Sequence, residues 1–207
     1  MKNKRGSHVG FIISFILFIT FVIFLLGLVN PSAKVQTEKK IVLENLKENV
    51  IKEISANLTI ISIKQKNPGI CKIPNDLILE NYATKESGEV IKIYSSQEIF
   101  DPQGNCNVDS AFDENDLGLI RNTKYIFKTK IEEMKKNYEE DYSSLKNRLN
   151  LPEENNFEFI FLEENGNEIK VESEEIRQTD VFSKLISISY IDKDGEIKTG
   201  YLNLKTW

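Results

Sequence analysis

The sequence predicts an α+β protein in which an N-terminal transmembrane helix is followed by an extracellular antiparallel-sheet domain with one long packed helix. Three patterns predict this class: an uninterrupted apolar run, alternating apolar segments separated by tight-turn pairs, and one amphipathic helical stripe. They divide the 207 residues into a basic cytoplasmic tip (1–8), a transmembrane helix (9–29), a juxtamembrane amphipathic helix (30–56) and the extracellular domain (57–207).

The apolar run extends from Val9 to Val29, contains no charged side chain and has 17 apolar residues among 21. A helix that rises about 1.5 Å per residue needs roughly 20 apolar residues to cross the hydrocarbon core of a bilayer. A cleaved secretory signal is the alternative, but its apolar region is usually about 7–15 residues long and ends at a small-residue cleavage site. Here Pro31 stands where a small residue is needed. We therefore expect a retained anchor in the lipid bilayer.

Charge is distributed unevenly around this run and predicts its orientation. Lys2, Lys4 and Arg5 precede it, whereas 24 basic and 32 acidic residues follow from Asn30 onward. Basic flanking residues stay on the cytoplasmic side of a membrane, so we expect a single-pass protein of the cell membrane with an extracellular C-terminal domain. The acidic domain would repel a phosphate backbone, which excludes nucleic acid as a partner.

The extracellular part begins with an expected helix from Lys39 to Ile54, separated from the anchor by a break at Pro31. Its apolar stripe is Leu43, Leu46, Val50 and Ile54. Strands are expected at Leu58–Lys64, Asp76–Asn81, Glu89–Tyr94, Phe157–Phe161, Glu168–Val171, Leu185–Tyr190 and Gly200–Trp207. The pairs Asn165-Gly166 and Asp194-Gly195 indicate hairpin turns, because glycine adopts positive φ at little cost.

Two longer segments complete the expected domain. Ser95–Asn122 is polar and is expected to be an irregular loop, while Thr123–Leu149 carries the strongest helical stripe of the extracellular part. That stripe consists of Ile131, Met134, Tyr138, Tyr142, Leu145 and Leu149. We expect it to face the core; docking of a separate coiled-coil partner is the alternative.

Two features depend on export of the domain. Cys71 and Cys106 are the only cysteines, and outside the cytosol such a pair commonly forms a disulfide, although two separate buried thiols are the alternative. Closing this loop would contribute about 3–4 kcal/mol. Asn57-Leu58-Thr59 is an acceptor sequence for N-glycosylation at Asn57.

Residues that perform common catalytic chemistry are scarce. The one histidine, His8, lies beside the membrane, which removes histidine-dependent triads and histidine-containing zinc sites from the extracellular domain, and no glycine-rich phosphate loop occurs. The acids of the long helix, Glu132, Glu133, Glu139, Glu140 and Asp141, are interpreted as a solvated face. We therefore expect no catalytic residue and no cofactor, with a carboxylate-based hydrolase as the remaining enzymatic alternative.

One segment has the ligand spacing of a twelve-residue calcium loop. The positions are Asn105, Asn107, Asp109, Ala111, Asp113 and Asp116. Ser110 replaces the glycine that the sharp turn requires, and Asp116 is shorter than the usual bidentate glutamate. We interpret the segment as a polar surface loop and expect no metal site.

The N-terminus, from Lys4 to Gly10 and into the apolar run, resembles the class III signal peptide of archaeal type IV pilin-like proteins. The resemblance implies cleavage after Gly6 by a membrane peptidase, with Ser7 as the new N-terminus. Phe11 stands at the fifth position of that processed chain, where bacterial-type pilins have glutamate. The region from Leu119 to Gly166 is similar to segments of archaeal membrane-anchored surface proteins.

The resemblance implies a structural subunit whose apolar helix assembles with copies of itself or with other pilin-like subunits, leaving the sheet domain outside. Five phenylalanines along the run suit a helix–helix face, although lipid-facing bulk is the alternative. They are Phe11, Phe15, Phe18, Phe21 and Phe24. A single-pass surface receptor or binding module that does not assemble is the second expected function.

Overall fold

The computed structural model describes residues 6–64, 71–74, 77, 79, 81–99, 106–109, 112–171 and 181–207, with the backbone alone for 6–8 and 28–37. The chain forms two compact units, one ending at Val42 and the other extending from Leu43 to Trp207. Each is described separately below. Helix α1 (Gly6–Glu53) contributes residues to both.

The expected break at Pro31 is wrong, because α1 is one helix of 48 residues that continues through this proline. A proline inside a helix removes one backbone hydrogen bond and crowds the preceding turn. The bonds of the turns before and after it remain, and in a helix this long they are sufficient to maintain the helical path. The apolar segment and the amphipathic segment are therefore two parts of the same element.

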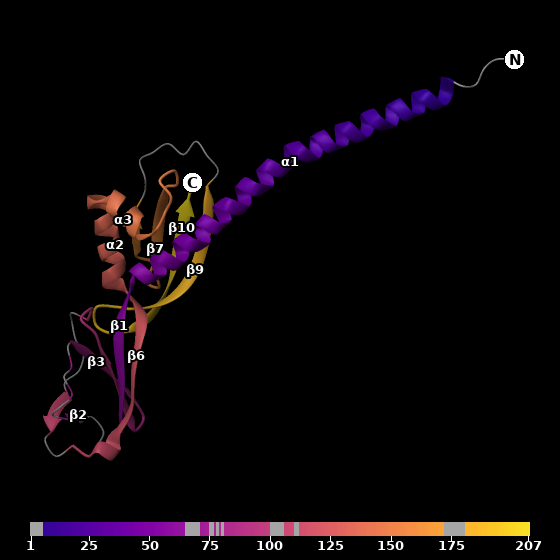
Figure 1. Ribbon diagram of the computed structural model, residues 1–207. Helices are drawn as coiled ribbons and strands as arrows, with labels where there is room; N and C mark the ends of the chain where they lie inside the picture. Colours follow the sequence, from indigo (N-terminus) through magenta and orange to yellow (C-terminus); the bar gives the residue numbers. More distant parts are fainter. Residues whose placement is uncertain are drawn as a thin grey trace. The chain divides into compact units, whose positions relative to one another are not determined.

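The second unit is built on a sheet of eight strands in the order β3-β4-β1-β6-β9-β10-β7-β8. Its strands are β1 (Ser55–Lys64), β3 (Tyr82–Ser87), β4 (Val90–Ser95), β6 (Leu117–Phe127), β7 (Phe157–Glu163), β8 (Glu168–Val171), β9 (Phe182–Ile191) and β10 (Ile197–Thr206). Figure 1 shows β10 between β7 and β9, and β1 beside β6. All neighbours are antiparallel except β6 and β9. These two strands run parallel and pair only through Ile126–Tyr190 and Phe127–Ile191.

A second, two-stranded sheet joins β2 (Cys71–Pro74) to β5 (Cys106–Asp109) in parallel. Ile73 of β2 is buried in a cluster with Ile61, Ile63 and Ile93 of the large sheet. A short 3₁₀ helix, η1 (Glu114–Asp116), leads from this region into β6. The expected loop at Ser95–Asn122 is thus partly wrong, since it contains β5 and the first half of β6.

The core of the second unit contains the stripes that the sequence predicts. Leu43, Leu46, Val50 and Ile54 are buried, and so are Phe157, Phe159 and Phe161 of β7. Two further helices, α2 (Lys128–Glu140) and α3 (Tyr142–Arg148), place Ile131, Met134, Leu145 and Leu149 in the interior. Tyr138 fixes α2 to the sheet by donating a hydrogen bond of 2.8 Å to the Phe157 carbonyl.

The expected single helix at Thr123–Leu149 is wrong in its continuity. The segment starts as the end of β6, becomes α2 at Lys128 and is interrupted at Asp141. The Asp141 carboxylate accepts a hydrogen bond of 3.1 Å from the Ser144 amide, which caps α3. This local bond competes with a continuous helix, because it satisfies an amide that the preceding turn would otherwise bind.

The remaining expected strands agree with the structure except one. Tyr82 begins β3, whereas Leu77, Leu79 and Asn81 lie outside any strand, so the strand expected at Asp76–Asn81 is placed too early. Both predicted hairpin turns are confirmed, with Gly166 at φ 86° and Gly195 at φ 84°.

Candidate functional site

The apolar part of α1 is the most prominent candidate for a functional surface. Among the described residues, Val9–Gly27 is the one helical stretch long and apolar enough to cross a membrane, with a mean hydropathy of 3.0. A signal sequence near an N-terminus meets the same criterion. The side chains of Val9–Gly27 are exposed almost throughout, and the exposed fraction of Phe11 reaches 74%. Exposed apolar residues on every side of a helix need either lipid or other helices around them.

The residues predicted for processing lie at the start of this helix. α1 begins at Gly6, and Ser7 is its second residue. Their side chains lie outside the described residues, so cleavage between them stays a prediction.

Cys71 and Cys106 form a disulfide. They are directly opposite one another in the β2–β5 pair, so the bond joins the first residues of two neighbouring strands. The pairing connects chain segments 35 residues apart and holds the small sheet together.

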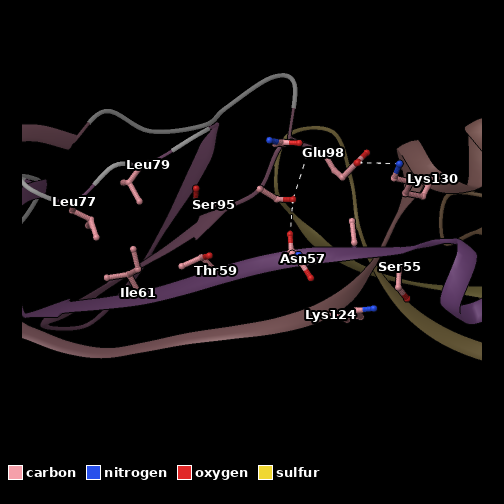
Figure 2. Close-up of a pocket in the computed structure, with 13 residues that line it drawn as sticks. Ser55, Asn57, Thr59, Ile61, Leu77, Leu79, Ser95, Glu98, Lys124 and Lys130 are labelled. Carbon is pink, nitrogen blue, oxygen red and sulfur yellow. Dashed lines mark hydrogen bonds and ion pairs between the residues drawn. The ribbon is translucent and has the colours of Figure 1, made fainter.

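A groove of about 690 Å³ lies beside β1 in the second unit, and Figure 2 shows its lining. Leu77, Leu79 and Ile61 lie at one end, whereas Glu98 and Lys130 lie at the other (Figure 2). Hydroxyl and amide side chains make up much of the remaining lining. These are Ser55, Asn57, Thr59, Ser95, Ser96 and Gln97.

Asn57, the predicted glycosylation acceptor, is exposed and lines this groove. Its backbone carbonyl accepts a hydrogen bond of 2.8 Å from the Ser96 hydroxyl, which joins β1 to the turn after β4. Two residues later, the Thr59 hydroxyl donates a bond of 2.9 Å to the Asn122 side chain. The structure therefore places the acceptor asparagine at an open surface, and its modification stays a prediction.

At the charged end of the groove, Lys130 is paired with two carboxylates. Lys130 contacts Glu98 at 3.3 Å and Glu133 at 2.7 Å, and Glu98 also accepts a hydrogen bond of 2.8 Å from the Thr129 hydroxyl. The hydrogen bond to Glu133 and the charge of Glu98 raise the pKa of Lys130 above its usual value, although burial opposes them. This lysine therefore remains a cation at neutral pH and is suited to binding rather than to accepting protons.

Sequence reasoning did not identify this groove. Its walls come from β1, from the turn after β4, from β6 and from the start of α2, which are up to 75 residues apart. A serine pair such as Ser95-Ser96 is an ordinary turn signal, and only the tertiary structure brings it next to Lys130.

The acids that the sequence analysis weighed for catalysis form surface ion pairs. Glu132 contacts Lys193 at 3.0 Å, and Glu133, Glu139 and Glu140 pair with lysines three or four residues away on α2. Asp141 caps α3. None of these acids lines the groove, although Glu133 contacts Lys130, which does.

The segment with calcium-loop spacing is divided among different elements. Asn107 and Asp109 belong to β5, where Asp109 binds Lys72 at 2.8 Å, and Asp113 caps η1. Asn105 and Ala111 lie outside the described residues, and Asp116 ends η1. Across the described ranges, no three His, Cys, Asp or Glu side chains gather in a way that would hold a metal ion.

A half-buried network of charges connects the start of α2 to the end of β7, to the turn after β9 and to the start of β10. Lys128 binds Glu163 at 2.9 Å and Asp192 at 3.8 Å, and Lys198 binds Asp192 at 2.7 Å. Burial would raise the pKa of Asp192, but the Lys198 hydrogen bond and the nearby lysine charges lower it below its usual value. The same hydrogen bond raises the pKa of Lys198. These shifts favour the charged forms of Lys128, Asp192 and Lys198, and the network fixes the start of α2.

Comparison of the chain with protein-family models, with curated proteins and with solved structures gives no match.

Proposed function

We propose that this protein is a membrane-anchored extracellular structural subunit, pilin-like in plan, which assembles through its apolar N-terminal helix. The observation that supports the proposal best is α1 itself. One helix of 48 residues begins as an exposed apolar segment and ends as an amphipathic segment with Leu46 and Val50 buried in the sheet unit. An element of this kind joins a membrane-embedded assembly surface directly to a folded domain.

The composition of the apolar segment supports helix–helix contact. Helices associate in lipid through close van der Waals packing, and small residues such as Gly10, Ser14 and Gly27 allow close approach. At Gly10 and Gly27 an added Cβ would meet nothing within 4 Å apart from the neighbouring residues and backbone of the helix itself. The disulfide between Cys71 and Cys106 fits an oxidising, non-cytosolic location for the second unit.

Mass spectrometry of the N-terminus of the native protein tests the processing step. We expect the mature chain to begin at Ser7, which requires loss of the six residues from Met1 to Gly6. Gly6→Leu should block the cut, because the peptidase of pilin-like proteins acts after a small residue. A native chain that retains Met1–Gly6 would remove support for processing.

Substitutions on opposite faces of the apolar helix test assembly. At 100° per residue, Phe15 and Phe18 lie on one face, and Ile13 and Ile16 lie on the other. We expect Phe15→Ala with Phe18→Ala to reduce recovery of the protein in sheared surface filaments, whereas Ile13→Ala with Ile16→Ala preserves it. Both double variants keep the run apolar. Complete absence of the wild-type chain from sheared material would contradict assembly.

The groove beside β1 supports a second candidate function, that of an anchored binding module which remains a monomer. Its polar lining and the Glu98–Lys130 pair suit a small polar ligand that accepts and donates hydrogen bonds. Thermal stabilisation of the full chain by a panel of oligosaccharides tests this alternative. Stabilisation that Gln97→Ala abolishes would favour the binding module.

A further inference from the structure

One face of the β3-β4-β1-β6 half of the sheet carries four basic side chains: Lys64, Lys85, Lys92 and Arg121, which we call the basic face. The register shows that they share a face, because directly paired residues in an antiparallel ladder point to the same side. Lys85 pairs with Lys92, Lys92 pairs with Ser62, and Lys64 lies two residues beyond Ser62. Arg121 pairs with Ile60, two residues before Ser62.

The four cations are exposed and make no ion pair within the described part of the chain. No acidic residue occupies a position of the same face on these four strands. Lys85 and Lys92 oppose each other directly, which is an unfavourable cross-strand pair. An anionic partner would remove this repulsion.

Apolar surface lies among the cations. Leu119 alternates with Arg121 along β6 and is 69% exposed, while Ile60 and Val90 of the same face are half-buried. In addition, β6 pairs with β9 only at Ile126 and Phe127, so the described strands leave most of one β6 edge without a neighbour. Apolar side chains gain from a contact that excludes water, which favours a protein surface over a hydrated polymer.

We propose that the basic face docks onto an acidic surface of a second copy of this chain. Charge complementarity supports this occupant: from Asn30 onward the chain has 24 basic and 32 acidic residues, and four of the basic ones lie on this face. The rest of each copy is correspondingly more acidic. Exposed carboxylates without an ion-pair partner in the described ranges include Glu153 and Glu154 before β7 and Glu164 and Glu168 after it.

The two surfaces in this contact differ, so the contact is heterologous and can repeat from copy to copy. The inference rests on the proposed function, since it adds a contact between extracellular domains to the contact between apolar helices. The two contacts differ in their response to salt. Exposed charges are screened at high ionic strength, whereas packing of apolar helices is not.

The test uses the full chain in detergent micelles, with the state of association measured by analytical ultracentrifugation at about 50 mM and about 500 mM NaCl. We expect the double variant Lys85→Glu with Lys92→Glu to self-associate at low salt about tenfold or more weakly than the wild type. The matched control is Lys40→Glu with Lys52→Glu, which changes the net charge equally at two exposed lysines of α1. This control should associate like the wild type.

A mixing experiment tests whether the contact is heterologous. The Lys85→Glu/Lys92→Glu variant retains its acidic surface, so it should bind the intact basic face of the wild type and end the growing array. Added to the wild type, it should therefore shorten the assemblies, whereas the Lys40→Glu/Lys52→Glu control should not.

Two outcomes would overturn the inference. One is unchanged low-salt association of the Lys85→Glu/Lys92→Glu variant when circular dichroism shows that it is folded. The other is that this variant binds vesicles containing anionic phosphatidylglycerol less than the wild type does, while its self-association is unchanged. That result would identify a lipid surface as the partner. Oligomers that persist at high salt are held together by the apolar helix alone. Absence of these oligomers would contradict helix-mediated assembly, and this result is distinct from loss of the salt-sensitive contact.

Discussion

At the scale of single residues, Gly195 lies where two segments of the second unit that are distant in sequence come into close contact. It lies in the β9–β10 turn at φ 84°, and a Cβ built on it would be 2.2 Å from the Cβ of Ala83 in β3. Gly166, in the β7–β8 turn, has nearly the same φ but has open space around it. Comparing substitutions at the two glycines therefore separates the cost of the left-handed backbone conformation from the cost of steric contact.

We predict that Gly195→Ala lowers the free energy of unfolding by about 2–4 kcal/mol, since it adds overpacking to the cost of a left-handed conformation. Gly166→Ala should cost only about 1–2 kcal/mol. Chemical denaturation of both variants measures the difference. Equal losses would show that the turn does not contact β3 in solution.

Asp192 is the second residue with a defined prediction, because two lysines converge on it. Asp192→Asn should lower the free energy of unfolding at neutral pH by about 1.5–3 kcal/mol, as expected for loss of charge-assisted hydrogen bonds. The pKa of this carboxyl is lowered in the folded state, so its stabilising effect is complete above the unfolded pKa of about 3.9 and disappears as the pH falls through the folded value.

Denaturation of the wild type and of Asp192→Asn between about pH 7 and pH 3 checks this sign. The difference between the two proteins should shrink as the pH falls below about 4. Asp194→Asn is the matched control in the same turn and should lower the free energy of unfolding at neutral pH less than Asp192→Asn does, since Asp194 makes no ion pair with the described residues.

At the scale of elements, the stretch from Thr123 to Leu149 shows what periodicity can and cannot reveal. The apolar stripe identified Ile131, Met134, Leu145 and Leu149 as core residues, and all four are buried. Periodicity does not indicate a local cap, so it predicted one continuous helix where α2 and α3 are separated at Asp141. It also missed that Phe127 belongs to a strand, because pairing with Ile191 of the distant β9 decides that conformation.

The opposed lysines of β3 and β4 provide a prediction at the same scale. Lys85→Glu converts a like-charge pair with Lys92 into an opposite-charge pair, so it should raise the free energy of unfolding by about 0.2–1 kcal/mol. Lys85→Ala removes the repulsion without adding attraction and should lie between this variant and the wild type. Thermal denaturation at low salt measures the order; a lower stability of Lys85→Glu would contradict the assigned register.

At the scale of the whole molecule, the disulfide between Cys71 and Cys106 closes a covalent loop in the second unit. We predict that Cys71→Ser with Cys106→Ser lowers the free energy of unfolding by about 3–4 kcal/mol, because the unfolded chain regains the entropy that the crosslink removes. A reductant should destabilise the wild type to a similar extent and leave the variant unchanged. Stability of the wild type that is insensitive to reductant would contradict a structural role for this bond.

By itself, the sequence determined the apolar segment of α1, the buried stripes of α1, α2 and β7, and the turns at Gly166 and Gly195. Each depends on residues within a few positions of one another, so local periodicity and local φ preferences are sufficient. Four other features depend on tertiary packing: the parallel junction of β6 with β9, the groove beside β1, the charge network at Asp192 and the basic face. Their members are far apart along the chain, and strand register and helix packing alone bring them together.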